Sequence, residues 1–474
     1  MHRPILSLTL ALGLTLAAFP AAAQIVTEAN CAAPDHTPTG HIAWPADNPV
    51  WEFDFIRFSR STGTEGSGVE IRDVYYRGRL VLRRGHIPVV NVLYDPGGCG
   101  CYRDWFDEES RFQADNPMPG QSCIALATPG TVVTTCENEG TDIGSFNGVA
   151  VEDYGNELVL TGHSRAGWYR YRMNWHFYLD GRIWPEFSAG ATNTSSCVTR
   201  PHTHHAYWRL DFDLNGAEND RVREVNPTTG TNVVLAAETK RDWGNPADGV
   251  YWVVEDEAAE MSYRIIPSAA DLLMPVTGLP DQTFDDEFAY MDAAVLRYQP
   301  NEIDDGVGFQ SGNAYCAINF EDAGRPNGLF INDENVDGQD VVFWYRGGTR
   351  HAPELFHDDN CHIVGPTLEL GAFPTGSGPG PGEVPAAGYV LERAAPNPFS
   401  ATTTLRFAVS EAQHVTVALY DVTGRRVAVL FEGRMPADRQ ETVQVDGAPL
   451  PAGTYVVRLE GERVMGATRI VLLH

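Results

Sequence analysis

The chain has 474 residues, which is too long for one ordinary hydrophobic core, so we expect two or three domains. A hydrophobic fraction of 43% is typical of soluble globular protein. The net charge of -29 argues against a nucleic-acid partner, because the phosphate backbone would be repelled.

Residues 1–23 have the layout of a secretory signal peptide. Arg3 precedes an apolar run from Ile5 to Phe19, and small residues then lead to an expected cleavage site near Ala23. No later stretch approaches the roughly 20 apolar residues that a membrane-spanning helix needs. We therefore expect an exported protein that is soluble after cleavage.

The region 24–372 is patterned as strands and turns. Runs rich in Val, Tyr, Trp and Phe alternate with charged residues and are interrupted by Asp-Gly and Asn-Gly pairs, with clear examples at 68–84, 156–184 and 339–348. This pattern predicts an all-β domain built as a large antiparallel β-sandwich.

Eight cysteines form an even set in a chain that is expected to leave the cytoplasm. Disulfides are the favoured interpretation, and a thiolate metal site is the alternative. The single residue between Cys99 and Cys101 is too short for common zinc spacings. The remaining cysteines are Cys31, Cys123, Cys136, Cys197, Cys316 and Cys361.

The segment 200–216 begins with a His-x-His pair, His202 and His204, on a predicted strand. Residues i and i+2 of a strand point to the same face, so these two imidazoles can converge on one metal ion, whereas His205 points to the other face. Imidazole suits copper. A pair of this kind also fits a polar strand edge, but a third histidine, His351, follows another apolar strand and favours a three-histidine site.

A Gly/Pro/Ser-rich stretch at 373–388 is typical of a linker. Residues 389–474 beyond it contain runs with period-two alternation separated by turn signals, such as "HVTVALYDV" and "GTYVVRLE". They predict a small, immunoglobulin-like β-sandwich.

This tail resembles the type A sorting domain of the type IX secretion system through "APNPF", "YDVTGRRV", "LPAGTYVVRL" and the terminal "RIVLLH". The resemblance implies an address that is read by the type IX secretion machinery. The protein would then be secreted or held at the cell surface after export through the periplasm of a double-membraned bacterium. A generic binding module is the alternative.

The central region resembles the catalytic domain of the copper-containing, topaquinone-dependent primary-amine oxidases. The matching text is "HTHHAYWRLDFDLNG" and "DGQDVVFWYRGGTRH", and further segments follow in the same order over 65–370. The resemblance implies that His202, His204 and His351 bind copper and that Tyr169 is the precursor of topaquinone. It also implies that a small primary amine and O2 are the substrates and that the protein is a homodimer.

Several residues depart from the family pattern around Tyr169. Arg165, Trp168 and Arg170 stand where the family has threonine, asparagine and an acidic residue, although Gly167 is retained. The family's catalytic base has two possible outcomes here. Either its segment is deleted, or Asp107 takes the role in an alignment that moves the Cys-x-Cys pair.

The same resemblance implies a second metal site and a disulfide. Asp211, the carbonyl of Phe212, and Asp340 would hold calcium or a similar ion through hard oxygen ligands. Cys101 and Cys136 occupy the places of a family disulfide, with Cys123 as a competing partner.

Three hypotheses remain open on the sequence. The first is an exported copper and topaquinone amine oxidase. The second is a secreted copper-binding protein on the same fold without oxidase activity, which the altered surroundings of Tyr169 favour. The third is a surface adhesin whose histidines are incidental.

Overall fold

A computed structural model shows a molecule whose regular secondary structure is almost entirely β-strand, and among the elements with described bounds the helical one is η1 (Phe58–Arg60). The all-β prediction is thus confirmed. The structure describes residues 24–63, 68–94, 99, 101–104, 108–137, 141–192, 196–241, 248–268, 271, 291–307, 310–311, 318–351, 363–373, 389–391, 394, 397, 399–409, 412–421, 425–436, 439, 441–461 and 465–473. The predicted signal peptide and nearly all of the predicted linker lie outside these residues.

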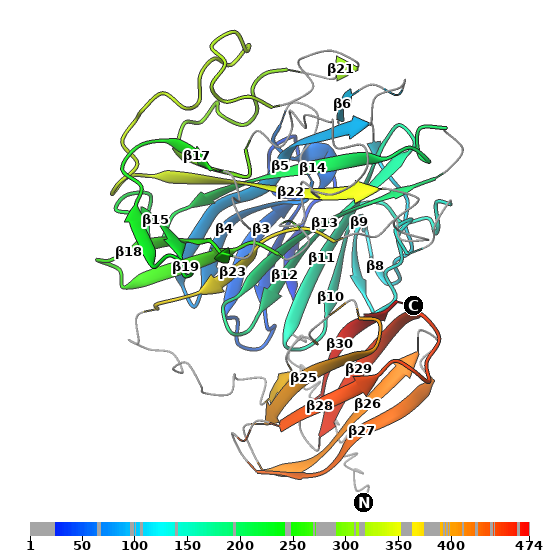
Figure 1. The fold of residues 1–474 in the computed structure, drawn as a ribbon. Coiled ribbons are helices and arrows are strands. Elements are labelled where there is room, and N and C mark those ends of the chain that lie inside the picture. The colour runs from blue at the N-terminus through cyan, green and yellow to red at the C-terminus, as the bar shows by residue number, and fades with distance from the viewer. Residues whose placement is uncertain are drawn as a thin grey trace, which may run out of the picture.

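The first sheet of the large domain has β14 near its centre, between β5 and β22 (Figure 1). Its order is β1 (Val26–Ala29), β2 (Gly40–Trp44), β3 (Trp51–Ile56), β4 (Glu70–Tyr76), β5 (Arg79–Tyr94), β14 (His202–Phe212), β22 (Val341–His351), β20 (Ala293–Arg297) and β17 (Thr239–Arg241), with β6 (Cys101–Asp104) paired to β5 and β21 (Gln310–Ser311) paired to β6.

The second sheet lies against the first and contains β12 between β11 and β13 (Figure 1). Its order is β16 (Thr231–Val234), β15 (Arg221–Asn226), β18 (Tyr251–Asp256), β19 (Met261–Ile266), β23 (Thr367–Leu370), β13 (Ile183–Ala191), β12 (Tyr169–Tyr178), β11 (Glu157–Ala166), β10 (Val149–Asp153), β9 (Gln121–Ala127) and β8 (Pro117–Met118), with β7 (Glu108–Glu109) paired to β11.

The core fills the space between the two sheets because alternate residues of each strand point into it. We call the side of each sheet that faces the other its inner face. Phe177 of β12 stacks on Phe53 of β3 with ring centroids 4.2 Å apart, and Trp51 meets the same ring edge-on. The period-two pattern read from the sequence therefore corresponds to burial of one face of each strand.

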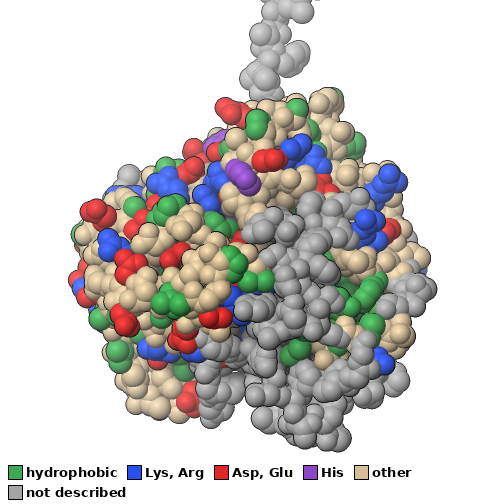
Figure 2. Space-filling view, turned by 90° about the horizontal axis from the view of Figure 1, so that it is seen from above, with side chains coloured by type: hydrophobic (Ala, Val, Ile, Leu, Met, Phe, Trp, Pro, Cys, Tyr) green, Lys and Arg blue, Asp and Glu red, His purple; other side chains and the backbone are tan. Residues whose placement is uncertain are grey.

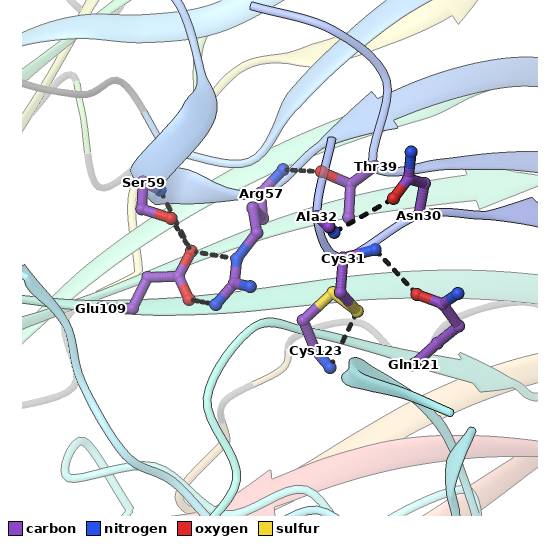
Figure 3. Close-up of a disulfide and its surroundings, with 9 residues drawn as sticks. All are labelled: Asn30, Cys31, Ala32, Thr39, Arg57, Ser59, Glu109, Gln121 and Cys123. Atoms are coloured by element: carbon purple, nitrogen blue, oxygen red, sulfur yellow. Dashed lines mark hydrogen bonds and ion pairs between the residues drawn. A yellow bond between two sulfur atoms is a disulfide. The ribbon is translucent and has the colours of Figure 1, made fainter. Parts of the chain in front are cut away.

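Covalent and ionic contacts also join the sheets (Figure 3). A disulfide links Cys31, which follows β1, to Cys123 of β9. Nearby, the carboxylate of Glu109 in β7 accepts hydrogen bonds from Arg57 Nε at 2.7 Å and from the Ser59 hydroxyl at 2.9 Å. These contacts tie the N-terminal strands of the first sheet to the second sheet.

β14 is buried on both faces, since all eleven of its residues are buried. A separate cluster that includes Tyr207, Phe320 and Trp344 covers its outer face. Polar side chains on that face therefore need protein partners. Arg209, for example, donates from Nε to the carbonyl of Glu302 at 2.9 Å.

The C-terminal domain is a smaller two-sheet sandwich with its own apolar core (Figure 1). One sheet contains β24 (Tyr389–Leu391), β25 (Thr402–Val409) and β28 (Glu441–Asp446), and the other contains β27 (Arg426–Met435), β26 (Gln413–Asp421), β29 (Gly453–Gly461) and β30 (Met465–Leu472). The sequence-based prediction of a second, small sandwich is confirmed.

The visible surface carries acidic and basic side chains interspersed with scattered apolar ones (Figure 2). Within the part of the chain that the structure describes, no helix is long and apolar enough to cross a membrane.

His163 of β11 provides a test of the buried polar layer on the outer face of the second sheet. Its side chain is buried, and its ring meets Phe112 edge-on at 5.8 Å. Burial lowers its pKa to about 4, with Arg170 adding to the shift and Glu137 and Asp142 opposing it. Between pH 6.5 and 4, His163 therefore binds a proton in the unfolded chain but not in the folded chain.

The parent protein should lose stability as the pH falls through this window, by about 3 kcal/mol near its acid end. We expect His163→Gln to abolish this loss. Thermal unfolding of the parent, the variant and a His41→Gln control across this pH range measures it. Parallel pH profiles for parent and His163→Gln would contradict the assignment.

Candidate metal centre

Two histidines share the inner face of β14. His202 and His204 are both fully buried, and their ring centroids lie 5.0 Å apart. They continue the row of inner-face residues formed by Ala206 and Trp208. Strand alternation thus brings two imidazoles together in the space between the sheets.

The surroundings of His202 determine which ring nitrogen carries the proton. Its Nδ1 lies 2.5 Å from the carbonyl oxygen of Arg200. Because a carbonyl can only accept, Nδ1 must donate, and the lone pair is on Nε2. That nitrogen faces the hydroxyl of Tyr169 at 2.5 Å. The tautomer of His202 is therefore the one that a metal ligand requires.

Tyr169 reaches this point from the opposite sheet. It begins β12 directly after a tight turn in which Gly167 has φ of 56°, a conformation that favours glycine. Its neighbours in the sheet are the small residues Ala166 and Ala191, which leave room for the ring. The ring packs edge-on against His204 with centroids 4.3 Å apart.

Tyr171 is a second tyrosine at this site, and sequence reasoning did not assign it a role. Its hydroxyl lies 3.1 Å from Nδ1 of His204. The available signal was its spacing, since a residue two positions after Tyr169 on a strand points to the same face. Tyr171 orients His204 as the Arg200 carbonyl orients His202.

An aromatic cluster covers the other side of His202. Tyr94 is the register partner of His202 on β5 and stacks on its ring at 4.7 Å. The indole Nε1 of Trp168 donates to the Tyr94 hydroxyl at 3.3 Å, and Tyr102 packs edge-on against both rings. The site therefore lies among rings that limit access of water.

His351 is the register partner of His202 on β22, so His202 lies between Tyr94 and His351 in the sheet. The pairing places the backbone of His351, the third predicted ligand, beside that of His202. The side chain of His351 lies outside the described part of the chain, as does the whole of Asp107, the candidate base.

The departures beside Tyr169 have separate structural roles. Arg170 is on the outer face of β12, where its guanidinium binds the carboxylate of Asp142 at 2.7 and 2.8 Å. Trp168 belongs instead to the aromatic cluster at Tyr94. Arg165 is the register partner of Arg170 on β11.

His205 lies on the outer face of β14, where it contacts the guanidinium of Arg346. Its Nδ1 is 2.9 Å from Nη1 of Arg346 on β22, and Arg346 also pairs with Asp292. Burial, with the guanidinium, lowers the pKa of His205 well below its ordinary value. The neutral ring accepts from Arg346 and helps to hold β22 against β14.

A second group of potential ligands lies at the far end of β14. Carboxylate oxygens of Asp211, Asp213 and Asp340 are all within 4.8 Å of one another. Burial raises the pKa of Asp211 to about 6 and that of Asp340 to about 7, and the neighbouring carboxylates contribute to both shifts. Such a cluster fits a hard cation such as calcium.

Sequence analysis named Asp211 and Asp340 for this site but missed Asp213. The signal was the Asp-x-Asp spacing, which places both carboxylates on one side of the chain where β14 ends. Phe212 lies between them with its side chain buried, and its carbonyl remains a predicted ligand.

A disulfide joins Cys99, just beyond β5, to Cys197, just before β14. It fixes the two segments that lead into Tyr94 and His202. Cys101 and Cys136 are also disulfide-bonded. Cys123, the competing partner, is bonded to Cys31, and the pairing of Cys101 with Cys136 remains a prediction.

Comparison with known families supports both resemblances. Residues 145–358 match the family model described as "Copper amine oxidase, enzyme domain", and residues 394–472 match "Secretion system C-terminal sorting domain". The chain therefore carries a copper amine oxidase-type enzyme domain followed by a secretion sorting domain. Residues 145–358 are thus similar to the enzyme domain of copper amine oxidases, and the sorting domain indicates a secreted or cell-surface protein.

Solved structures that resemble the chain include several amine oxidases. A copper-containing benzylamine oxidase from Hansenula polymorpha is 16% identical, with a TM-score of 0.43, and the match covers 70% of this chain and 59% of that one. An Aspergillus nidulans amine oxidase is 18% identical (TM-score 0.41; 69% and 52%), and a Pichia pastoris lysyl oxidase is 14% identical (TM-score 0.42; 68% and 52%). The chain thus spans between half and three fifths of these structures.

We expect calcium to raise the thermal stability of the protein through the three aspartates. Binding to the folded state alone contributes about 2.7 kcal/mol when calcium is about a hundred times its Kd. Scanning calorimetry after chelation, with and without added calcium, measures the shift. Asp213→Ala should abolish it, and the exposed control Asp35→Ala should retain it. An equal shift in Asp213→Ala would rule out this site.

Proposed function

We propose that the protein is a secreted, copper-dependent primary-amine oxidase. It would convert a primary amine, O2 and water to an aldehyde, ammonia and hydrogen peroxide. The observation that carries the proposal is the approach of Tyr169 from one sheet to His202 on the other, with 2.5 Å between its hydroxyl and Nε2. This contact places the phenol next to the nitrogen that is proposed to bind copper.

The donor set suits copper(II). The tautomer of His202 leaves a lone pair on the nitrogen that faces the site, and His204 is a second buried imidazole beside it. His351 is proposed as the third ligand from its register position opposite His202. Copper held there would supply the redox chemistry that activates O2 and oxidises the ring of Tyr169 to topaquinone.

The chain's own residues position Tyr169. The phenol oxygen of Tyr169 lies 2.5 Å from Nε2 of His202, so it is directed at the lone pair that copper would bind. Ring contacts with His204 and Tyr171 fix the plane of the phenol. The rings of Tyr94 and Trp168 exclude water from the neighbouring space, which strengthens electrostatic interactions within it.

A second candidate function is copper binding without oxidation. It is favoured by Trp168, which stands where the family has asparagine and whose indole donates to the Tyr94 hydroxyl beside His202. Asp107 remains the candidate base for proton abstraction in the oxidase. In the alignment that keeps the Cys-x-Cys pair in place, the base-bearing segment is deleted, and the protein would be a non-catalytic, secreted copper-binding protein.

We also propose that the C-terminal domain addresses the protein to the type IX secretion machinery of a double-membraned bacterium. The match of residues 394–472 to a secretion sorting domain supports this. Homodimerisation and the identity of the amine remain predictions from the resemblance.

We expect His204→Ala to weaken copper binding by more than roughly 100-fold, because changes in outer-shell groups alone commonly cost 10- to 100-fold. Metal analysis after dialysis against a competing chelator measures the affinity, and His41→Ala serves as a control on β2, away from the proposed ligands. Unchanged copper content in His204→Ala would remove the basis of the metal assignment.

We expect the copper-loaded protein in air to develop quinone colour, stain in a redox-cycling assay and release peroxide with simple amines. Tyr169→Phe should abolish all three and retain copper, because the quinone is proposed to form from the phenol ring of Tyr169. Colour that persists in Tyr169→Phe would refute the assignment of Tyr169. A colourless, copper-replete parent protein would contradict the oxidase proposal and support copper binding without oxidation.

A further inference from the structure

The outer face of the second sheet carries a polar pocket on the reverse side of the strand that holds Tyr169. β12 directs Tyr169, Tyr171 and Trp175 into the core. Its alternate residues Asn174 and His176 instead line the pocket. Any ligand in this pocket is therefore separated from the candidate metal centre by the sheet itself.

Asn174 provides the first indication of a ligand. Only 4% of the residue is exposed, and within the described part of the chain its side-chain Oδ1 is buried with no hydrogen-bond partner. A buried amide oxygen without a partner costs about 1–3 kcal/mol. Asn174 therefore contributes to the pocket lining a buried amide oxygen whose hydrogen-bonding capacity is unused among the described residues.

The charges around the pocket favour a cationic donor. Glu137, Glu152 and Glu157 line it together with Arg172 and His176. His176 faces Glu157 through Nδ1 at 2.7 Å and Glu186 through Nε2 at 2.9 Å. Both ring nitrogens of His176 are thus occupied by carboxylates, which leaves the ring no capacity for a further ligand.

Carboxylates outnumber guanidinium groups around the pocket. Arg172 pairs with Glu137 and Glu186, and His176 contacts Glu157 and Glu186. Arg182, the other guanidinium near Glu157, lies over the ring of Tyr178 and pairs with Asp180. Negative charge thus remains in excess, and buried negative charge favours the entry of a cation.

The spacing of the acceptors distinguishes between kinds of cation. Among the described residues, the group of acidic, histidine or cysteine side chains close enough to share one metal ion is Asp211, Asp213 and Asp340, at a different place in the fold. The carboxylates of this pocket do not converge in that way. A group with several diverging N–H donors can satisfy separated acceptors.

We propose that this pocket is a second binding site, for the ammonium group of a primary amine, with Asn174 Oδ1 as one acceptor and the surrounding carboxylates supplying the charge. The site is independent of copper and of Tyr169, so it does not rest on the proposed oxidase function. The ammonium group is that of a free alkylamine or of a lysine side chain.

Calorimetric titration of the full chain tests the proposal. The Tyr169→Phe protein is titrated with n-butylammonium chloride, so that turnover does not interfere, and tetramethylammonium chloride at equal ionic strength is the cation without N–H groups. We expect saturable binding of butylammonium and none of tetramethylammonium. Equal binding heats for the two salts would mean that the pocket holds only water, and they would contradict the proposal.

Variants at Asn174 locate the binding. Asn174→Leu should weaken butylammonium binding by about ten-fold, because a hydrogen bond to a charged donor is lost. Asn174→Asp keeps an acceptor and adds charge, so its affinity should equal or exceed that of the parent. Equal affinity in Asn174→Leu and the parent would place the amine elsewhere. If Asn174→Leu does not fold, Thr161→Val, also in the pocket lining, replaces it with the same criterion.

A final pair of titrations distinguishes the two sources. Nα-acetyl-lysine amide carries the same ammonium group on a peptide-like body. Binding of both compounds indicates a lysine side chain of a partner, and binding of butylammonium alone indicates a free amine. Failure of both would overturn the site while leaving the copper and quinone experiments unaffected.

Discussion

The candidate metal centre depends on the antiparallel pairing of β14 between β5 and β22. That pairing sets Tyr94, His202 and His351 abreast in adjacent strands. A slip of one residue would turn every side chain of β14 to the other face, replacing His202 and His204 by Thr203 and His205. On the outer face, Arg209 contacts the Glu302 carbonyl and Arg346 contacts His205. These contacts stabilise the register of β14 and therefore also the position of the histidines on its inner face.

The two faces of β12 are used for different chemistry. Its inner face supplies aromatic rings to the core and Tyr169 and Tyr171 to the histidines. Its outer face carries Arg170, Arg172, Asn174 and His176, which are nonetheless buried. Continuous burial of all ten residues requires the outer polar groups to find partners within the protein, and the chain of carboxylates around Arg172 and His176 provides most of them.

Local pattern predicted much of this molecule, since strand alternation specified the two sandwiches and the shared face of His202 and His204. What it did not predict are contacts made across long separations. The approach of Tyr169 to His202 joins opposite sheets, and the Cys31–Cys123 and Cys99–Cys197 pairings join residues 92 and 98 positions apart. The role of Tyr171 depends on where His204 lies, so spacing alone could not assign it. Asp213 is different, because its spacing from Asp211 was visible and was not used.

The disulfide between Cys99 and Cys197 has a consequence for the order of maturation. Both cysteines border the segments that enter the metal centre, so the shape of that centre is completed only after the thiols have been oxidised. In a reducing compartment the chain would lack this disulfide, and the loops that carry the two cysteines could adopt other conformations. On the proposed export route, an oxidising compartment would thus close the disulfide that borders the candidate metal centre.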